Sequence, residues 1–448
     1  MIEFSERTDL EAGVETVESL RILRRKRSVS PNDFDVTGDV SEYLTPDAKN
    51  RLSEIETIDD VFREISWLAQ ERFNPKSEDG RNARLKIDSI LTYGRAAERS
   101  QYFGFPEYIR RTLALGSGFE VQINGVPEEE LKEQRNVVVQ RFSKLGYDFT
   151  RFGWSCFQRD NKIEEKNLRR VFEEAREKLL PKMKQAFAVD FSPNYKIAVE
   201  KKDEYWLNWV SGSTSGFLQR LNSHERHEGR RVNGVEERLT CHELTHMFQM
   251  HSLMLNIRNG IVNPFYGITT TPGIEQWNSE SLADSITKFL PEIYEQLSDF
   301  GKFALEYETY RQWIYRDAHI LLNSWDSNEW TRIRERLHLE LPSESEDILD
   351  KEIEDRTTNP KNRAYRFAYA GSFEHTQIAK ILTHSISYYD KRREFVDYCL
   401  FRPRTPDEVI IKARELENEM PLSKIPFSQK LKGLFGINRI SGTSLSSQ

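Results

Sequence analysis

Residues 242–246 read His-Glu-Leu-Thr-His, the HExxH spacing that suits a metal site. On an α-helix, positions i and i+4 differ by only about 40° in direction, so His242 and His246 would lie side by side and could bind one ion. Glu243 is rotated by about 100° from His242, where a carboxylate can reach a water on the metal without replacing it. The motif therefore predicts two zinc ligands and a general base. The alternative is a surface helix that matches the pattern by chance.

A helix over this motif is supported by the residues around it. Glu236 and Glu237 would occupy its first turn, where acidic side chains favour the helix dipole. An apolar stripe for packing against a core follows the helical period, and its members are Leu244, Met247, Phe248 and Leu255.

A catalytic zinc site needs a third protein ligand and one open position for water. Glu280 and Asp284 are again i and i+4, on a helix that we expect to open at Thr271-Pro272 and to end near Pro291. One carboxylate can bind the metal while the other accepts the free ring N–H of a ligating histidine. Glu275 is the rival third ligand; it lies about 140° around the helix from Glu280 and suits a first-turn acid better.

With both motifs in view, the sequence resembles the gluzincin metallopeptidases, the broad group of thermolysin and aminopeptidase N. In that group two histidines and a later glutamate bind zinc, and the glutamate of the first motif activates water. The resemblance implies that His242, His246 and Glu280 hold one Zn²⁺ per chain, that Glu243 is the base and that Asp284 supports a ligand. The long gap between the motifs is closer to the mostly helical oligopeptidases and carboxypeptidases of the group.

Three downstream stretches are similar to a poorly characterised bacterial family with an EGWALY-type motif at the third-ligand position. They are RQWIYRDAHILLNSW (311–325), EIEDRTTNPKNRAYRFAYAGSFEH (352–375) and DKRREFVDYCL (390–400). That family usually has extra residues, with a Pro-Gly, inside its first motif, whereas this chain has the plain form. The resemblance covers about residues 205–415.

A peptidase of this kind also needs a donor for the oxyanion, opposite the metal. Tyr365, Tyr369 and His375 are the candidates, because a Tyr or His from a downstream helix is the usual supplier in the clan. The sequence leaves the choice among them open. Arg226, Arg230 and Arg231 could bind a substrate carboxylate, although arginines in loops are usually solvated.

The scaffold that must position these residues is expected to be mainly α (α+β), with a small mixed sheet beside the active-site helix. Apolar periodicity predicts helices at 51–75, 126–145 and 162–188, and strand character appears at 118–124, 195–200 and 205–222. We expect a helical N-terminal region over 1–190 and a catalytic domain over 191–420. Residues 421–448 would form a basic, flexible tail that could touch a membrane or a partner weakly.

Composition narrows the function classes. The 448 residues carry 65 Lys+Arg against 72 Asp+Glu, a net charge of −7, which argues against broad nucleic-acid binding. The first residues lack a signal-peptide pattern, and no apolar run is long enough for a membrane span. Three widely spaced cysteines favour a reducing compartment, so we expect a cytoplasmic protein.

Two main functional hypotheses follow. The first is a zinc-dependent peptidase that uses metal-activated water, with a peptide substrate held by strand addition along 205–222. The second is a non-catalytic binding or regulatory protein on a peptidase-like scaffold. A third, nucleic-acid binding, depends only on the Arg24–Arg27 run and the basic tail. Substrate identity, endo- or exopeptidase action, the role of the N-terminal half and the oligomeric state are not encoded in these patterns.

Overall fold

The fold is described from a computed structural model. It describes residues 4–26, 34–36, 43–99, 105–112, 125–187, 194–203, 207–213, 216–270, 274–323, 329–358, 372–382 and 389–418. Several sequence predictions fall outside these residues or their described side chains: the strand at 118–124, the Arg24–Arg27 side chains, Tyr365, Tyr369 and the tail at 421–448. The described part is mainly α-helical with a small mixed sheet, as the sequence predicted.

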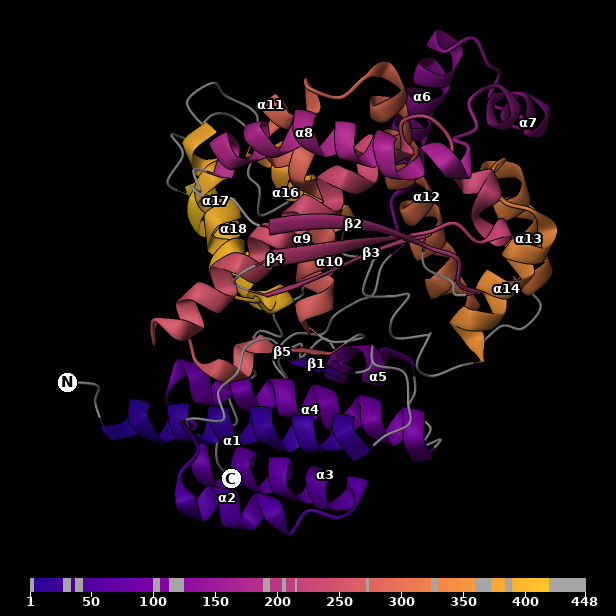
Figure 1. Cartoon of the computed structure of the whole chain (residues 1–448). Coiled ribbons are helices and arrows are strands. Elements are labelled where there is room, and N and C mark those ends of the chain that lie inside the picture. The colour runs from indigo at the N-terminus through magenta and orange to yellow at the C-terminus, as the bar shows by residue number, and fades with distance from the viewer. Residues whose placement is uncertain are drawn as a thin grey trace, which may run out of the picture.

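The N-terminal helices form a layer of their own at the bottom of the view in Figure 1. The layer comprises α1 (Phe4–Lys26), α2 (Pro46–Ser53), α3 (Ile58–Trp67), the π-helical turn η2 (Leu68–Arg72), α4 (Glu78–Arg99) and α5 (Phe105–Thr112). Its core joins Val17, Ile65 and Ile90 to Phe265 and Ile268 from the chain after the motif helix. A short antiparallel pair, β1 (Phe34–Val36) with β5 (Ile268–Thr270), adds a second link.

The prediction of a single helix over 51–75 is wrong in one respect, because the helix is interrupted between α2 and α3. Thr57 caps α3: its hydroxyl accepts from the Asp60 backbone, and the Asp60 carboxylate accepts from the Thr57 N–H. α2 has already ended at Ser53, and this reciprocal pair starts a new helix at Ile58. The apolar spacing continues across the break, which is why periodicity alone predicts one element.

The middle of the chain supplies a second helical group around an aromatic core. It contains α6 (Glu128–Lys144), α7 (Arg151–Asp160), the 3-10 turn η3 (Glu165–Asn167) and α8 (Leu168–Phe187), so the predicted helices at 126–145 and 162–188 are confirmed. The Phe142 ring stacks on Phe303 with centroids 4.7 Å apart and on Trp154 at 5.6 Å. These contacts hold α6 and α7 against the long helix α12 (Asp299–Leu322).

The sheet has three strands in the order β2-β4-β3. β2 (Asn194–Glu200) runs parallel to β4 (Gly216–Asn222), and β3 (Asn208–Ser213) pairs antiparallel with β4. The strand at 195–200 is therefore confirmed, and the strand character at 205–222 corresponds to two strands, β3 and β4, that pair with each other. β3 packs against α9 (Val235–Arg258), the helix that carries the His-Glu-Leu-Thr-His motif. Figure 1 shows the sheet lying across α9 and α10 (Ile274–Phe289).

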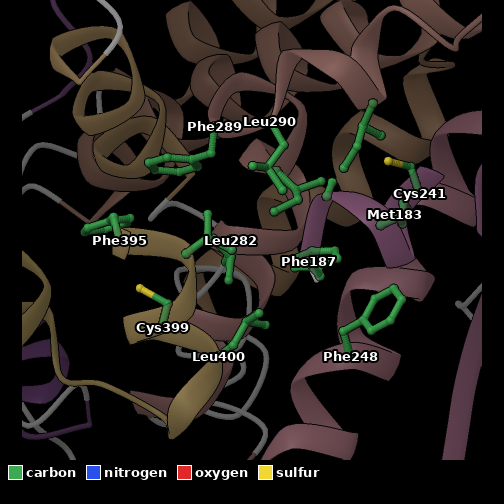
Figure 2. Close-up of a cluster of buried hydrophobic side chains, with 14 of the residues drawn as sticks. Met183, Phe187, Cys241, Phe248, Leu282, Phe289, Leu290, Phe395, Cys399 and Leu400 are labelled. Atoms are coloured by element: carbon green, nitrogen blue, oxygen red, sulfur yellow. The ribbon is translucent and has the colours of Figure 1, made fainter. Parts of the chain in front are cut away.

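α9 and α10 are anchored by the largest hydrophobic cluster. Figure 2 shows side chains from α8, α9, α10 and α17 (Tyr389–Phe401) gathered in it. Leu244, Met247 and Phe248 of the predicted stripe are buried, whereas Leu255 is exposed; at this end of α9, Leu253 and Met254 are the buried residues. Phe289 stacks on Phe395 at 5.0 Å, which ties the end of α10 to α17.

The remaining elements complete this helical body. They are η4 (Glu225–Arg230), η5 (Pro264–Gly267), α11 (Pro291–Tyr294), α13 (Glu329–Glu340), α14 (Glu346–Thr357), α16 (Ser372–Ile381) and α18 (Pro406–Asn418). The four larger hydrophobic clusters each combine side chains from both sides of residue 190. None of the helices in the described ranges combines the length and apolarity that a membrane span requires.

Candidate metal centre

The two motifs meet at one point between α9 and α10. His242 Nε2 lies 2.9 Å from His246 Nε2 and 3.2 Å from Glu280 Oε2, and His246 Nε2 lies 3.5 Å from Glu280 Oε1. Among the described residues, His242, His246 and Glu280 form the one group of His, Cys or acidic side chains close enough to share a metal ion. The three predicted ligands are therefore brought together.

The spacing of these atoms fits a small tetrahedral ion. Ligands about 2.0–2.1 Å from zinc at tetrahedral angles lie roughly 3.3 Å from one another. The two histidine nitrogens lie 2.9 Å apart, and each has a different Glu280 oxygen at 3.2 or 3.5 Å, so the separations are of this size. Two nitrogens and one carboxylate are also the donor set of His₂Glu zinc sites. The side chains of His242 and His246 remain 13% exposed, so the centre is reachable from solvent.

The hydrogen bonds on the far side of each imidazole leave its Nε2 atom available to the centre. His242 Nδ1 lies 2.9 Å from Asp284 Oδ1, and His246 Nδ1 lies 2.9 Å from Gln249 Oε1. Since a carboxylate and an amide oxygen can only accept, each Nδ1 carries a proton, and Nε2 is the ring nitrogen left to bind a cation once it is deprotonated. Asp284 therefore has the supporting position that the sequence predicted for it.

These supporting groups are themselves held in place. Gln312 of α12 donates its side-chain N–H to Asp284 Oδ2 at 2.7 Å. The Ser279 hydroxyl donates to Gln249 Oε1 at 2.8 Å and lies 3.0 Å from His246 Nδ1. Both ligand histidines are thus oriented by side chains from two elements.

Glu243 lies beside the ligands but is held by the sheet. Its Oε1 atom accepts a hydrogen bond from Asn208 Nδ2 of β3 at 2.8 Å. Within the described residues no group donates to its other oxygen, Oε2. The carboxylate thus has one fixed oxygen and one oxygen available to a water molecule.

Burial and charge shift the pKa values of the groups in the centre. Burial opposes protonation of His242, yet the carboxylates of Asp284 and Glu280 raise its pKa well above the ordinary value. Burial also opposes ionisation of Glu280, but the two imidazoles lower the pKa of its carboxyl. Burial raises the pKa of Glu243, with His242 and His246 opposing the shift. Two basic nitrogens and a readily ionised carboxylate form a favourable site for a divalent cation.

Other residues considered for the site differ in where the structure places them. Cys241, the residue before the first ligand, is buried in the core, and burial raises the pKa of its thiol to about 12. His375 is fully buried on α16, with its ring 5.0 Å from that of Trp277. The side chain of the rival Glu275 lies outside the described part, as do both tyrosines proposed as oxyanion donors.

Of the three loop arginines, the structure describes the side chains of Arg230 and Arg231. Arg231 is buried and donates to the Ser223 carbonyl at 3.4 Å, which is a structural role. Arg230 is exposed, and the side chain of Arg226 falls outside the described part.

Four residues of the centre were missed by sequence reasoning: Asn208, Gln249, Ser279 and Gln312. Gln249 lies three residues after His246 on the same helix, and that spacing could have identified it. Asn208 and Gln312 come from other elements, so no local spacing connects them to the motif.

Comparisons with known proteins add information on the fold only. No family model matches the chain, and no curated protein matches it. One solved structure, described as "the putative lipoprotein from Colwellia psychrerythraea", is similar with a TM-score of 0.50 and 12% sequence identity. The match covers 84% of this chain and 65% of that protein, so this chain spans just under two thirds of its length.

Proposed function

We propose that this protein is a zinc-dependent peptidase of the gluzincin type. The observation that supports this best is the convergence of His242 Nε2, His246 Nε2 and the Glu280 carboxylate, which lie close enough to share one ion. The Nδ1 protons are directed outward, so each Nε2 atom faces the position that a cation would occupy. Glu243 lies beside this centre, and only one of its carboxylate oxygens is bonded to Asn208. The other oxygen can accept a proton, so Glu243 can serve as the base that hydrolysis needs.

Each residue then has a defined task. Bound zinc would act as a Lewis acid, lowering the pKa of a water ligand towards about 7 and polarising the scissile carbonyl. Glu243 accepts the proton from the attacking water through Oε2, while Asn208 holds Oε1. Asp284 and Gln249 keep the imidazoles in the orientation that zinc requires.

The proposed substrate is a peptide that lies along β3. In the described part of the chain β3 pairs with β4 on one side, and it packs next to α9. An edge strand offers backbone N–H and C=O groups to an extended peptide, which would place a scissile bond near the motif helix. A cytoplasmic location is part of the proposal, and it is compatible with Cys156, Cys241 and Cys399 being free thiols.

The test is cleavage of a diverse peptide library by purified protein with zinc, compared with the same protein after chelation. Activity that is lost on chelation and restored by zinc supports the proposal. Stoichiometric zinc without cleavage of any peptide would instead favour the non-catalytic binding protein. Matched peptides with free and amidated C-termini, present in the same library, distinguish carboxypeptidase from endopeptidase action.

A further inference from the structure

A chain of three hydrogen bonds crosses the sheet and ends on Glu243. The Tyr195 hydroxyl of β2 donates to Gln219 Oε1 of β4 at 2.6 Å. Gln219 Nε2 donates to Asn208 Oδ1 of β3 at 2.9 Å, and Asn208 Nδ2 donates to Glu243 Oε1 at 2.8 Å. One side chain from each strand therefore links the far edge of the sheet to the motif helix.

The strand register places all three side chains on the same face. Ile197 and Val210 are the direct partners of Gln219 in the neighbouring strands, and Tyr195 and Asn208 each lie two residues from these partners. Cross-strand partners point to the same side of a sheet, and so do residues two apart along a strand. The chain thus runs diagonally over the face that packs on α9.

This face is otherwise apolar, which makes the polar chain unusual. Gln219 is completely buried between Phe217 and Leu221 of its own strand, both of which are also buried. A buried amide costs free energy unless its donor and acceptor are both satisfied, and apolar residues of similar shape can be equally stable. Core packing alone therefore does not require an amide at this position.

The residues at the two ends, Glu243 and Tyr195, determine which group donates in each of the three hydrogen bonds. An ionised Glu243 can only accept, so Asn208 must present its N–H group to it and its carbonyl oxygen to Gln219. Gln219 must then present its own oxygen to Tyr195, whose hydroxyl donates. Burial raises the pKa of Tyr195, and the nearby Glu243 carboxylate raises it further, so the hydroxyl stays a donor.

We propose that Asn208, Gln219 and Tyr195 are positioning residues that orient the Glu243 carboxylate towards the attacking water. Asn208 makes the contact, and the other two fix the rotation of its amide so that an N–H group, and not a carbonyl oxygen, faces the carboxylate. The inference deepens the proposed peptidase function and rests on it. Because the Asn208 N–H group donates to Oε1, Oε2 is the oxygen of Glu243 that receives the proton from the water.

Two substitutions test the chain at different distances from the base. Asn208→Leu removes the donor but keeps similar volume, and kcat should fall by about 10- to 100-fold with KM changed by less than about 3-fold. Tyr195→Phe removes a single hydroxyl at the far end, so kcat should fall by about 3- to 10-fold. Zinc content should stay at the wild-type level in both.

The decisive readout is the coupling between the two substitutions. If Tyr195 acts through Asn208, Tyr195→Phe should have no further effect on kcat in the Asn208→Leu background. Arg220→Met is the matched control, since Arg220 bonds Ser211 at 2.7 Å and Glu200 at 3.4 Å across the opposite face of the same sheet. It weakens the sheet without touching the chain, and kcat per zinc-loaded molecule should not change.

A second readout does not depend on activity. In crystal structures of the metal-free variants, Glu243 should leave its position in Asn208→Leu, and the residue 208 amide should lose its single orientation in Tyr195→Phe. A Glu243 side chain unmoved in Asn208→Leu, or additive effects on kcat, would overturn the inference. If the wild-type protein cleaves no peptide, the proposed function fails, and the crystal structures still decide whether the chain orients Glu243.

Discussion

Gln312 donates to Asp284 Oδ2 at 2.7 Å, while the other oxygen of the same carboxylate lies 2.9 Å from His242 Nδ1. The carboxylate is therefore held on both sides, by α12 and by the ligand that it orients. α9, α10 and α12 follow one another along residues 235–322, and Figure 1 gives them neighbouring colours. The metal centre thus depends on the packing of three helices and not on the motif helix alone.

Asp284→Asn should weaken zinc binding by about 10- to 100-fold. An amide has one acceptor oxygen, so it cannot accept from both His242 and Gln312 as the carboxylate does. The measurement is competition with a chelator of known affinity. Gln312→Met is the companion variant, with a smaller expected loss, and unchanged affinity in both would remove Asp284 from the site.

His242→Ala or His246→Ala should eliminate zinc from a protein that otherwise binds about one zinc per chain. Each substitution removes one of two Nε2 atoms that lie 2.9 Å apart, and the two remaining ligands cannot hold the ion tightly. Elemental analysis of dialysed protein gives the answer. Full retention of metal by both variants would contradict the ligand assignment.

Glu280→Gln should lower zinc affinity severely, whereas Glu275→Gln should leave it near the wild-type value. Glu280 reaches both ligand histidines, at 3.2 and 3.5 Å, and the amide replaces its charge with a weaker donor oxygen. The pair is matched, since both residues belong to α10. If a zinc titration shows that Glu275→Gln loses affinity and Glu280→Gln does not, Glu275 is the third ligand.

Zinc binding should strengthen as the pH rises from about 5 to about 8, because protons and zinc compete for the two imidazoles. Asp284 and Glu280 raise the pKa of His242, and Glu280 raises that of His246 although burial opposes both shifts. In the metal-free protein these raised values contribute stability below about pH 6.5 that is lost as the pH rises through them. The gap in melting temperature between zinc-loaded and metal-free protein should therefore widen with pH. A gap that is constant or narrows would contradict this assignment of charges.

The ligands were predictable because each pair is encoded within one helical turn. His242 with His246, and Glu280 with Asp284, need only a helix to bring them onto one face, and local sequence specifies helices well. The meeting of α9 with α10 could not be derived in the same way. The resemblance to a known clan, and not periodicity, suggested that these two helices share an ion.

The sheet contribution was not predictable, for a physical reason. Asn208 reaches Glu243 because β3 packs on α9 with one particular register and face, and a slip of one residue would turn the side chain away. Sequence predicted a strand there but not which of its side chains meets the motif. The break before α3 was missed for a different reason, because the Thr57 and Asp60 capping signal lies inside a continuous apolar pattern.

The central claim is that Glu243 is the base of a zinc peptidase, and Glu243→Gln tests it most directly. Glutamine keeps the size of the side chain and can accept the hydrogen bond from Asn208, but it cannot take up the proton. The measurement combines zinc content, melting temperature and peptide cleavage on the same preparations of wild-type and variant protein. We predict about one zinc per chain and similar melting temperatures in both, with turnover lower by roughly 10²- to 10⁴-fold in the variant. Wild-type turnover in a zinc-loaded Glu243→Gln protein would contradict the account.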